Sequence, residues 1–471
     1  MRPNANRNHR TSGAPRWRRA VGVLSIAVAV VLGVGANSVA AAPPTEDGPT
    51  AAGYGAAWIA AAFDQQIPME NFGSGDWGVT LDGALALAAA QVGATQLDAV
   101  WTALIDQRED ALAPGGVDAP GRLARAILLA EVLGEDPRAV GSEPGADLVA
   151  RLEVTRRTSG TDEGLYGTTD PLYDGSFRQG YALAALVVAG VSPDPTAVQW
   201  LLAQQCVGAD AGAWMAYRAD TSVPCAFDAD LFVGPDTNAT AAAITGLDAV
   251  GEGDDAIGAA LDWLDTVQEP DGGWAQLSGF GTDPNSTALV IQALLAVDQA
   301  GAARFADQDA TPLAALLSFQ LGCTSPAGDG GAFTFPGSND APNGFATVQA
   351  VPAAAGVPAV FTPASIAAGV APLDCTPPTT STTTSTSTTS TLAPTTAAPT
   401  TAAPSTTAAP GAEVAGLTGS AGSTATPTTA SASALAVTGT SPAPLVVFGA
   451  TLVLVGLGVL LMARRRSTFA G

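Results

Sequence analysis

Two aspartates occupy matching positions in a repeated segment and are the residues of this sequence best placed to do chemistry. Asp236 and Asp283 each begin the pattern Asp-x-Asn-x-Thr, directly before an apolar run with helical spacing. If the two helices are neighbours, the carboxyl groups could act as the acid and the base of glycan hydrolysis. We favour the alternative that both aspartates cap helices, because aspartate is among the best N-cap residues. A helix N-terminus also lowers the pKa of a carboxyl group, which disfavours a general acid there.

Three aromatic residues form the second candidate set. Trp214, Trp274 and Phe333 each follow a glycine in the same repeated pattern, and their rings could stack on a sugar or on a planar ligand. Large aromatic side chains at a repeated turn more often pack inside the protein, so we favour packing. These three residues, with Asp236 and Asp283, are the candidate ligand-binding residues.

The residue types that are missing exclude several kinds of catalysis. The sequence contains one histidine, His9, and no lysine. His9 lies in the predicted signal peptide, so the exported chain would have neither residue type. This excludes a Ser-His-Asp triad, a histidine-bound zinc, a P-loop lysine and a Schiff base. We expect no cofactor, no metal site and no catalytic residue, although the paired aspartates leave an enzyme open.

The charge of the chain argues against nucleic acid as a partner. The formal net charge is −24, and nine of the 19 basic residues lie in the two terminal segments. Acidic residues therefore outnumber basic ones strongly in the central part of the chain. Such a surface repels nucleic acid and anionic lipid, so we expect neither as a ligand.

The N-terminal residues 1–42 have the three parts of a secretory signal peptide. Residues 1–19 are polar and basic, residues 20–36 are apolar, and Ala40, Ala41 and Ala42 supply the small residues that a signal peptidase reads. We therefore predict export, with cleavage after Ala40 or Ala42. The alternative is an uncleaved N-terminal membrane anchor.

The C-terminal end predicts attachment to the cell surface. An apolar segment, 445–463, begins at Leu445, ends at Ala463 and is followed by three arginines in the tail 464–471. This pattern predicts a transmembrane helix with a cytoplasmic C-terminus. Just upstream lies a pentapeptide formed by Leu435, Ala436, Val437, Thr438 and Gly439.

The pentapeptide (435–439), the apolar span and the basic tail together resemble the cell-wall sorting signal of Gram-positive surface proteins. Ala436 replaces the usual proline, as in the Leu-Ala-x-Thr-Gly variant of high-GC Gram-positive bacteria. The resemblance implies that a sortase cleaves after Thr438 and joins the chain to peptidoglycan. The alternative is a single-span membrane anchor without processing. Either way, we expect the protein at the cell surface.

A low-complexity segment separates the anchor from the rest of the chain. Residues 376–434 consist almost entirely of threonine, serine, proline and alanine. Such a composition buries too little apolar area to offset the entropy of ordering, so we predict a disordered stalk.

The remaining residues, 51–375, carry recurring apolar runs with helical spacing and no alternating pattern typical of strands. The runs cover 81–92, 121–133, 180–191, 240–250 and 287–297, and turns rich in aspartate, asparagine, glycine or proline precede them. We predict an all-α domain of about six helical-hairpin repeats.

The clearest repeat has the form Trp263-Leu264-x3-Gln268-x3-Gly272-x-Trp274. It resembles the QW repeat of squalene cyclases and prenyltransferase/squalene-oxidase repeat proteins. The match is good around Trp200 and Trp263, poorer around Gln320 and faint elsewhere. The resemblance implies an α6/α6 toroid, with six inner helices inside six outer ones.

The catalytic motifs of those relatives are missing. The sequence contains no Asp-x-Asp-Asp, and its nearest approach is Asp228-Ala229-Asp230. Asp254 and Asp255 lack the third acid of Asp-Asp-x-x-Asp. Thioester-containing complement domains share the toroid architecture, and their motif Cys-Gly-Glu-Gln is also absent. The zinc site of protein prenyltransferases needs a histidine that the exported chain lacks. A fold can be retained without its catalytic residues, so we favour a binding role.

The four cysteines predict two disulfides, because an exported chain meets an oxidising environment. Three pairings are possible. We favour Cys206 with Cys225 and Cys323 with Cys375.

We therefore expect a surface-anchored, non-catalytic protein that binds an unidentified ligand or surface partner. The alternatives are a glycan- or lipid-active enzyme that uses acids at the mouth of the toroid, and a passive wall spacer.

Overall fold

The computed structural model describes residues 47–141, 146–306 and 310–375. Five predicted segments lie outside the described residues: the signal peptide (1–42), the stalk (376–434), the sorting motif (435–439), the transmembrane helix (445–463) and the tail (464–471). Within the described part, no helix combines the length and the apolar character that crossing a bilayer requires.

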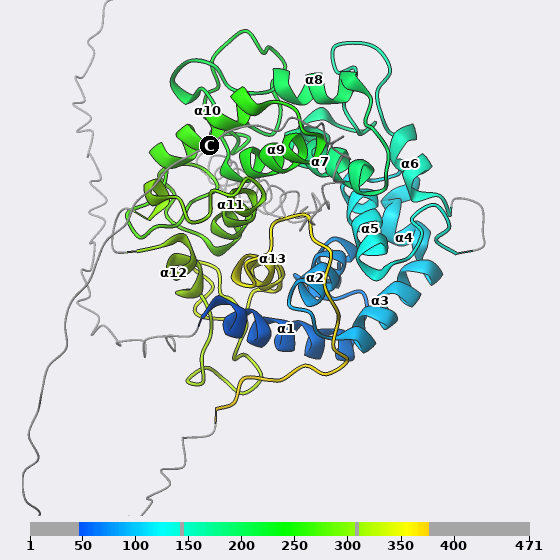
Figure 1. Ribbon diagram of the computed structural model, residues 1–471, viewed down its shortest axis with the longest axis vertical. Helices are drawn as coiled ribbons and strands as arrows, with labels where there is room; N and C mark the ends of the chain where they lie inside the picture. Colours follow the sequence, from blue (N-terminus) through cyan, green and yellow to red (C-terminus); the bar gives the residue numbers. More distant parts are fainter. Residues whose placement is uncertain (1–46, 142–145, 307–309, 376–471) are drawn as a thin grey trace, which may run out of the picture. The chain divides into compact units, whose positions relative to one another are not determined.

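The described residues are mainly helical, which confirms the all-α class (Figure 1). The inner set of helices is α2 (Trp77–Ala89), α5 (Pro120–Leu133), α7 (Pro171–Val188), α9 (Thr237–Val250), α11 (Pro284–Ala296) and α13 (Gly344–Ala354). The outer set is α1 (Gly48–Gln65), α3 (Ala94–Asp106), α6 (Leu148–Val154), α8 (Pro195–Ala203), α10 (Asp254–Thr266) and α12 (Pro312–Leu317).

Shorter elements complete the described part. Helix α4 spans Arg108–Leu112, and single 3-10 turns span Pro114–Gly116, Gly208–Asp210 and Ala303–Phe305. The two strands, β1 (Glu70–Asn71) and β2 (Ser74–Gly75), form an antiparallel hairpin in which Glu70 pairs with Gly75. Strands are therefore scarce, as the absence of alternating apolar residues predicted.

The inner helices contact one another in a cyclic order. Helix α2 packs on α5, α5 on α7, α7 on α9, α9 on α11, α11 on α13, and α13 packs back on α2 (Figure 1). Five of these helices correspond to the five apolar runs of the sequence. The first outer helix, α1, begins at Gly48, slightly before the predicted start of the domain at position 51, because Asp47 caps it through Thr50.

The inner helices are buried on all sides, since neighbours and outer helices cover them. Every residue of α2 is buried, and so are most residues of α11. Small residues allow close approach: a Cβ at Gly180 on α7 would lie 2.0 Å from the carbonyl oxygen of Ala242 on α9. A helix that is apolar all round suits a core position, not a surface position.

One hydrogen-bond pattern joins the long loop to the inner helix in the repeats of α9, α11 and α13. The backbone N–H of Trp214 donates to Thr240 Oγ1 at 2.8 Å, and that of Trp274 donates to Thr287 Oγ1 at 3.0 Å. Phe333 donates in the same way to the equivalent threonine of α13 at 2.9 Å. The repeat inferred from the sequence is thus repeated in hydrogen-bond geometry.

Candidate functional site

The three aromatic candidates are packing residues in this structure. Trp214, Trp274 and Phe333 are each 0% exposed. Trp214 donates its Nε1–H to the carbonyl of Leu201 at 2.7 Å, and Trp274 donates to that of Leu264 at 2.9 Å. Each tryptophan therefore fastens a long loop to the outer helix before it, and none of the three rings has a face open to a ligand.

The two candidate aspartates are helix caps. Asp236 Oδ1 accepts hydrogen bonds from the backbone N–H of Asn238 and of Ala239, at 2.7 and 3.0 Å. Asp283 Oδ1 accepts from the N–H of Ser286 at 2.8 Å, and its Oδ2 accepts from Ser286 Oγ at 2.8 Å. The caps of α9 and α11 are thus as the sequence analysis favoured.

Gln276 links the two caps. Its side-chain Nε2 donates to Asp236 Oδ2 at 2.9 Å, and its backbone N–H donates to Asp283 Oδ2 at 3.1 Å. The structure therefore brings the two carboxyl groups close to each other, as hydrolysis would also require. Most of their acceptor positions are occupied by the protein itself, which favours a structural role.

The pKa values of these aspartates correct one expectation. Burial raises the pKa of Asp236 to about 6, although hydrogen bonds from Gln276 and the cap oppose the rise. Burial also raises the pKa of Asp283. The expected lowering by the helix N-terminus is wrong, because desolvation of a nearly fully buried carboxylate outweighs the helix dipole.

Another buried acid lies where α2, α5 and α7 meet. Asp82 Oδ1 accepts from Arg125 Nε at 2.6 Å, and both side chains are at most 2% exposed. Burial raises the pKa of Asp82 to about 7, while Arg125 opposes the rise. Tyr181, from α7, lies close enough to both to feel their charges. Local spacing in the sequence does not reveal this group, because Asp82 and Arg125 lie 43 positions apart on different helices.

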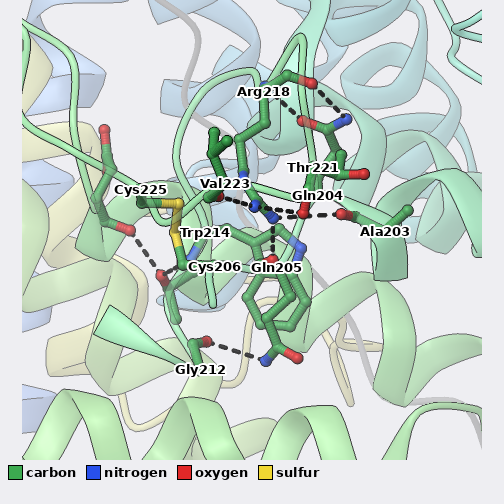
Figure 2. Close-up of a disulfide and its surroundings, with 12 residues drawn as sticks. Ala203, Gln204, Gln205, Cys206, Gly212, Trp214, Arg218, Thr221, Val223 and Cys225 are labelled. Carbon is green, nitrogen blue, oxygen red and sulfur yellow. Dashed lines mark hydrogen bonds between the residues drawn. A yellow bond between two sulfur atoms is a disulfide. The ribbon is translucent and has the colours of Figure 1, made fainter. Parts of the chain in front are cut away.

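The loop between α8 and α9, residues 204–236, is held by a disulfide (Figure 2). Cys206 is bonded to Cys225, and Cys323 is bonded to Cys375 near the end of the described part. Both favoured pairings are therefore present. The first bond joins the two ends of the 206–225 segment, which contains no regular helix longer than one turn.

Arg218 holds the same loop from inside. Its Nη2 donates to the carbonyl oxygens of Thr221 and Val223, both at 2.7 Å, and its Nη1 donates to the carbonyl of Gln205. Its backbone N–H donates to Gln204 Oε1 at 2.6 Å. Figure 2 shows the bonds to Gln205, Thr221 and Val223 meeting at the guanidinium group. Arg218 is 5% exposed, so this cation works as an internal crosslink.

This loop and the loop before α11 expose three phenylalanines that pack on one another. We name Phe227, Phe232 and Phe280 the phenylalanine cluster. Their ring centroids lie 5.0 to 6.0 Å apart, and their exposed fractions are 48%, 44% and 59%. Exposed contiguous apolar surface marks interaction sites in soluble proteins. The sequence carried one signal for this cluster, large apolar residues inside an aspartate-rich loop, which we did not use.

A pocket of about 550 Å³ lies beside the β1–β2 hairpin, between α1 and the start of α13. Trp58, Met69, Phe72 and Asn343 contribute to its lining. Its volume is in the range of small-molecule sites. Among the described residues, no cluster of histidine, cysteine, aspartate and glutamate has the arrangement of a metal site.

No family model matches the chain, and no curated protein matches it. Among solved structures, a protein from Actinoplanes is similar, with 18% identity and a TM-score of 0.44 over 66% of this chain and 98% of that one. Protein geranylgeranyltransferase-I of Candida albicans complexed with GGPP is also similar, with 12% identity and a TM-score of 0.46 over 63% of this chain and 89% of that one.

Proposed function

We propose that this chain is a non-catalytic binding protein displayed at the cell surface and that its cyclic helix array is an α6/α6 toroid. The observation that carries the proposal is the construction of the 204–236 loop. A disulfide and the buried Arg218 hold this long irregular loop rigid while it exposes apolar side chains. Long, rigidly held loops on a stable scaffold are typical of binding sites.

The candidate carboxyl groups support binding over hydrolysis. Asp236 and Asp283 accept hydrogen bonds from their own helix starts and from Gln276. A general acid and a general base must instead present a proton and a free lone pair to the substrate. These two groups would need the caps of α9 and α11 to open before they could act.

The proposed binding function is tested by identifying the molecules that co-purify with the protein. The full chain is expressed in a high-GC Gram-positive host, purified with its bound material, and examined by mass spectrometry. A stoichiometric ligand or partner supports the proposal. A chain that carries nothing and captures nothing from growth medium or wall fragments would be a passive spacer.

The anchoring part of the proposal rests on the sorting motif 435–439, the apolar span 445–463 and the basic tail. A sortase would join Thr438 to peptidoglycan. We expect wild-type protein on the wall fragments that lysozyme releases. Thr438→Ala protein should stay with the membrane, and its presence on those fragments would refute sorting.

One observation favours the alternative of an enzyme. Asp82 is a buried carboxyl group with a pKa raised to about 7, and acids of this kind can protonate a substrate. Asp82→Asn and Asp236→Asn are therefore assayed with polyprenyl and glycan substrates beside the wild type. Turnover that either variant abolishes, while folding is retained, would replace the binding proposal with a catalytic one.

A further inference from the structure

We propose that the phenylalanine cluster is a docking surface for a basic, apolar segment of a partner protein. This inference rests on the proposed binding function and names the chemistry of the partner. Three observations support it: the phenylalanine rings are exposed, the loop that carries two of them is restrained, and exposed aspartates lie beside them in the chain.

The aromatic area is assembled from two loops of neighbouring repeats. Phe227 and Phe232 come from the loop before α9, and Phe280 comes from the loop before α11. Phe232 lies edge-on to both of the other rings, at interplanar angles of 83° and 79°. Aromatic side chains, phenylalanine among them, are enriched at protein interfaces, where a few well-packed residues supply most of the binding energy.

The backbone around the cluster is fixed. Asp228 and Val233 exchange two backbone hydrogen bonds, of 2.7 and 3.2 Å, and Asp228 Oδ1 accepts from the N–H of Asp230 and of Leu231. Phe232 has a φ of 53°, in the left-handed region that bulky residues avoid. This conformation costs free energy, so the surrounding backbone bonds must hold Phe232 in it.

The rigid loop lowers the cost of binding. The Cys206–Cys225 disulfide and the carbonyl bonds of Arg218 lie directly before the Phe227–Phe232 segment in the chain. These restraints order the preceding segment, and the bonds of Asp228 order the segment that carries Phe227 and Phe232. Less conformational entropy therefore remains to be lost on association.

The negative charge beside the cluster indicates that the partner is positively charged. Asp228 and Asp230 are exposed and lie between the first two phenylalanines in the chain. The single basic residue of residues 204–236 and 267–283 is Arg218, whose guanidinium is taken up by internal carbonyls. An acidic surround favours a positively charged partner through electrostatic complementarity.

The same features disfavour a glycan or a lipid surface. The three rings lie at steep angles to one another and form no flat shelf for a sugar ring. The exposed aspartates repel anionic headgroups. An apolar side chain flanked by arginine or lysine satisfies both the rings and the carboxylates.

The test uses the full chain in nanodiscs of phosphatidylcholine and fluorescence anisotropy of labelled peptides, with empty nanodiscs as background. The probe is a peptide of arginine, leucine and glycine. One comparison peptide replaces arginine with glutamate, and another replaces leucine with serine. We expect the probe to bind at least about tenfold more tightly than either comparison peptide, and to bind more weakly as ionic strength rises.

Two variants locate the binding. Phe280→Ala should weaken binding of the probe at least about tenfold. The matched control is Phe335→Ala, because Phe335 is also exposed in the loop before an inner helix but lies outside the cluster; it should leave binding unchanged. The double variant Asp228→Asn and Asp230→Asn keeps the side-chain acceptor of the turn and should reduce the salt dependence.

Other results would overturn the inference in distinguishable ways. If the probe fails to bind, or if Phe280→Ala folds normally and binds it as the wild type does, the docking surface is wrong. If the protein carries a co-purified ligand or partner that the probe does not displace, or if neutral glycan fragments bind in place of the probe, the binding function stands and only this partner chemistry fails. If neither probe nor any other material binds, the proposed function fails as well.

Discussion

Gln320 donates a hydrogen bond from its Nε2 atom to the carbonyl oxygen of Ala51, 2.7 Å away and 269 positions earlier in the chain. The same amide group donates to the carbonyl of Gly331, in its own loop, at 2.9 Å. Gln205 and Gln268 each make a matching pair of bonds, one to a glycine of their own loop and one to a backbone carbonyl in or shortly before the next outer helix. The bond that joins neighbouring repeats therefore also joins the last repeat to the first helix.

Replacing this glutamine should destabilise the whole fold. Gln320→Leu preserves much of the side-chain volume but leaves the carbonyls of Ala51 and Gly331 without their donor. We expect the free energy of unfolding to fall by about 1–3 kcal/mol, because two part-buried hydrogen bonds are lost. Chemical denaturation monitored by circular dichroism measures the loss. The control Gln107→Leu changes an exposed glutamine, and an equal loss there would contradict the assigned role.

The repeats were predicted best where an apolar run and the Trp–Gln–Gly–Trp spacing occur in the same repeat. The apolar runs correspond to inner helices because full burial selects apolar residues at every position. The Trp–Gln–Gly–Trp spacing identified the repeats around Trp200 and Trp263, where the glutamine and its glycine acceptor are close in sequence. The predicted caps Asp236 and Asp283 are local features too, and they are present.

The third repeat is only faint in the sequence because a distant residue supplies the bridging amide. Arg156 occupies the place of the glutamine there, as its pairing with Tyr166 shows. Gln179 on α7 donates instead to the carbonyls of Gly164 and Ala197, at 3.0 and 2.9 Å, and its Oε1 accepts from the N–H of Tyr166. One side chain thus replaces both the glutamine and the threonine of the other repeats.

Only those features of the candidate site that depend on neighbouring residues in the sequence could be predicted. Capping follows from residue type and position, whereas the raised pKa of Asp236 depends on burial by segments distant in sequence. The internal crosslink by Arg218 and the exposure of Phe280 likewise depend on how loops of adjacent repeats pack. Such tertiary properties leave no periodic signal.

Removing the Cys206–Cys225 disulfide should loosen one loop and leave the helices intact. The bond closes a segment with a sequence separation of 19, for which chain entropy gives about 3 kcal/mol of stabilisation. The variant Cys206→Ser with Cys225→Ser should lose roughly that much stability and show faster amide exchange in residues 206–225. Hydrogen exchange read by mass spectrometry checks this. In the matched pair Cys323→Ser with Cys375→Ser, exchange in 206–225 should stay slow; faster exchange there would contradict a local effect.

Asp236 should make stability depend on pH in an identifiable window. Its folded pKa of about 6 is above the ordinary value of 3.8, so between these values the folded protein keeps a proton that the unfolded chain releases. The contribution of the protonated carboxyl group is therefore fully present below about pH 4 and is lost as the pH rises to about 6. Two pKa units correspond to roughly 3 kcal/mol.

The variant Asp236→Asn isolates this effect, because asparagine caps a helix about as well as aspartate and does not titrate. Urea denaturation of the variant and the wild type at several pH values between 4 and 7 gives the difference in unfolding free energy. We expect that difference to change by roughly 3 kcal/mol in favour of the variant as the pH rises. The exposed Asp265→Asn should follow the wild type, and parallel curves for Asp236→Asn would contradict the raised pKa.

Gly212 should tolerate no side chain, since two independent constraints act on it. Its φ of 102° lies in the region that favours glycine, and a Cβ there would lie 2.1 Å from the carbonyl oxygen of Ala259 in the next outer helix. Gly212→Ala should therefore cost about 3 kcal/mol or more. Gly258, inside α10, is the control, because a Cβ there meets nothing within 4 Å. Gly258→Ala should raise stability by about 0.5–1 kcal/mol, as alanine is the better helix former. Thermal melts of both variants provide the comparison, and a mild effect at Gly212 would show that the loop and α10 are not in the close contact described.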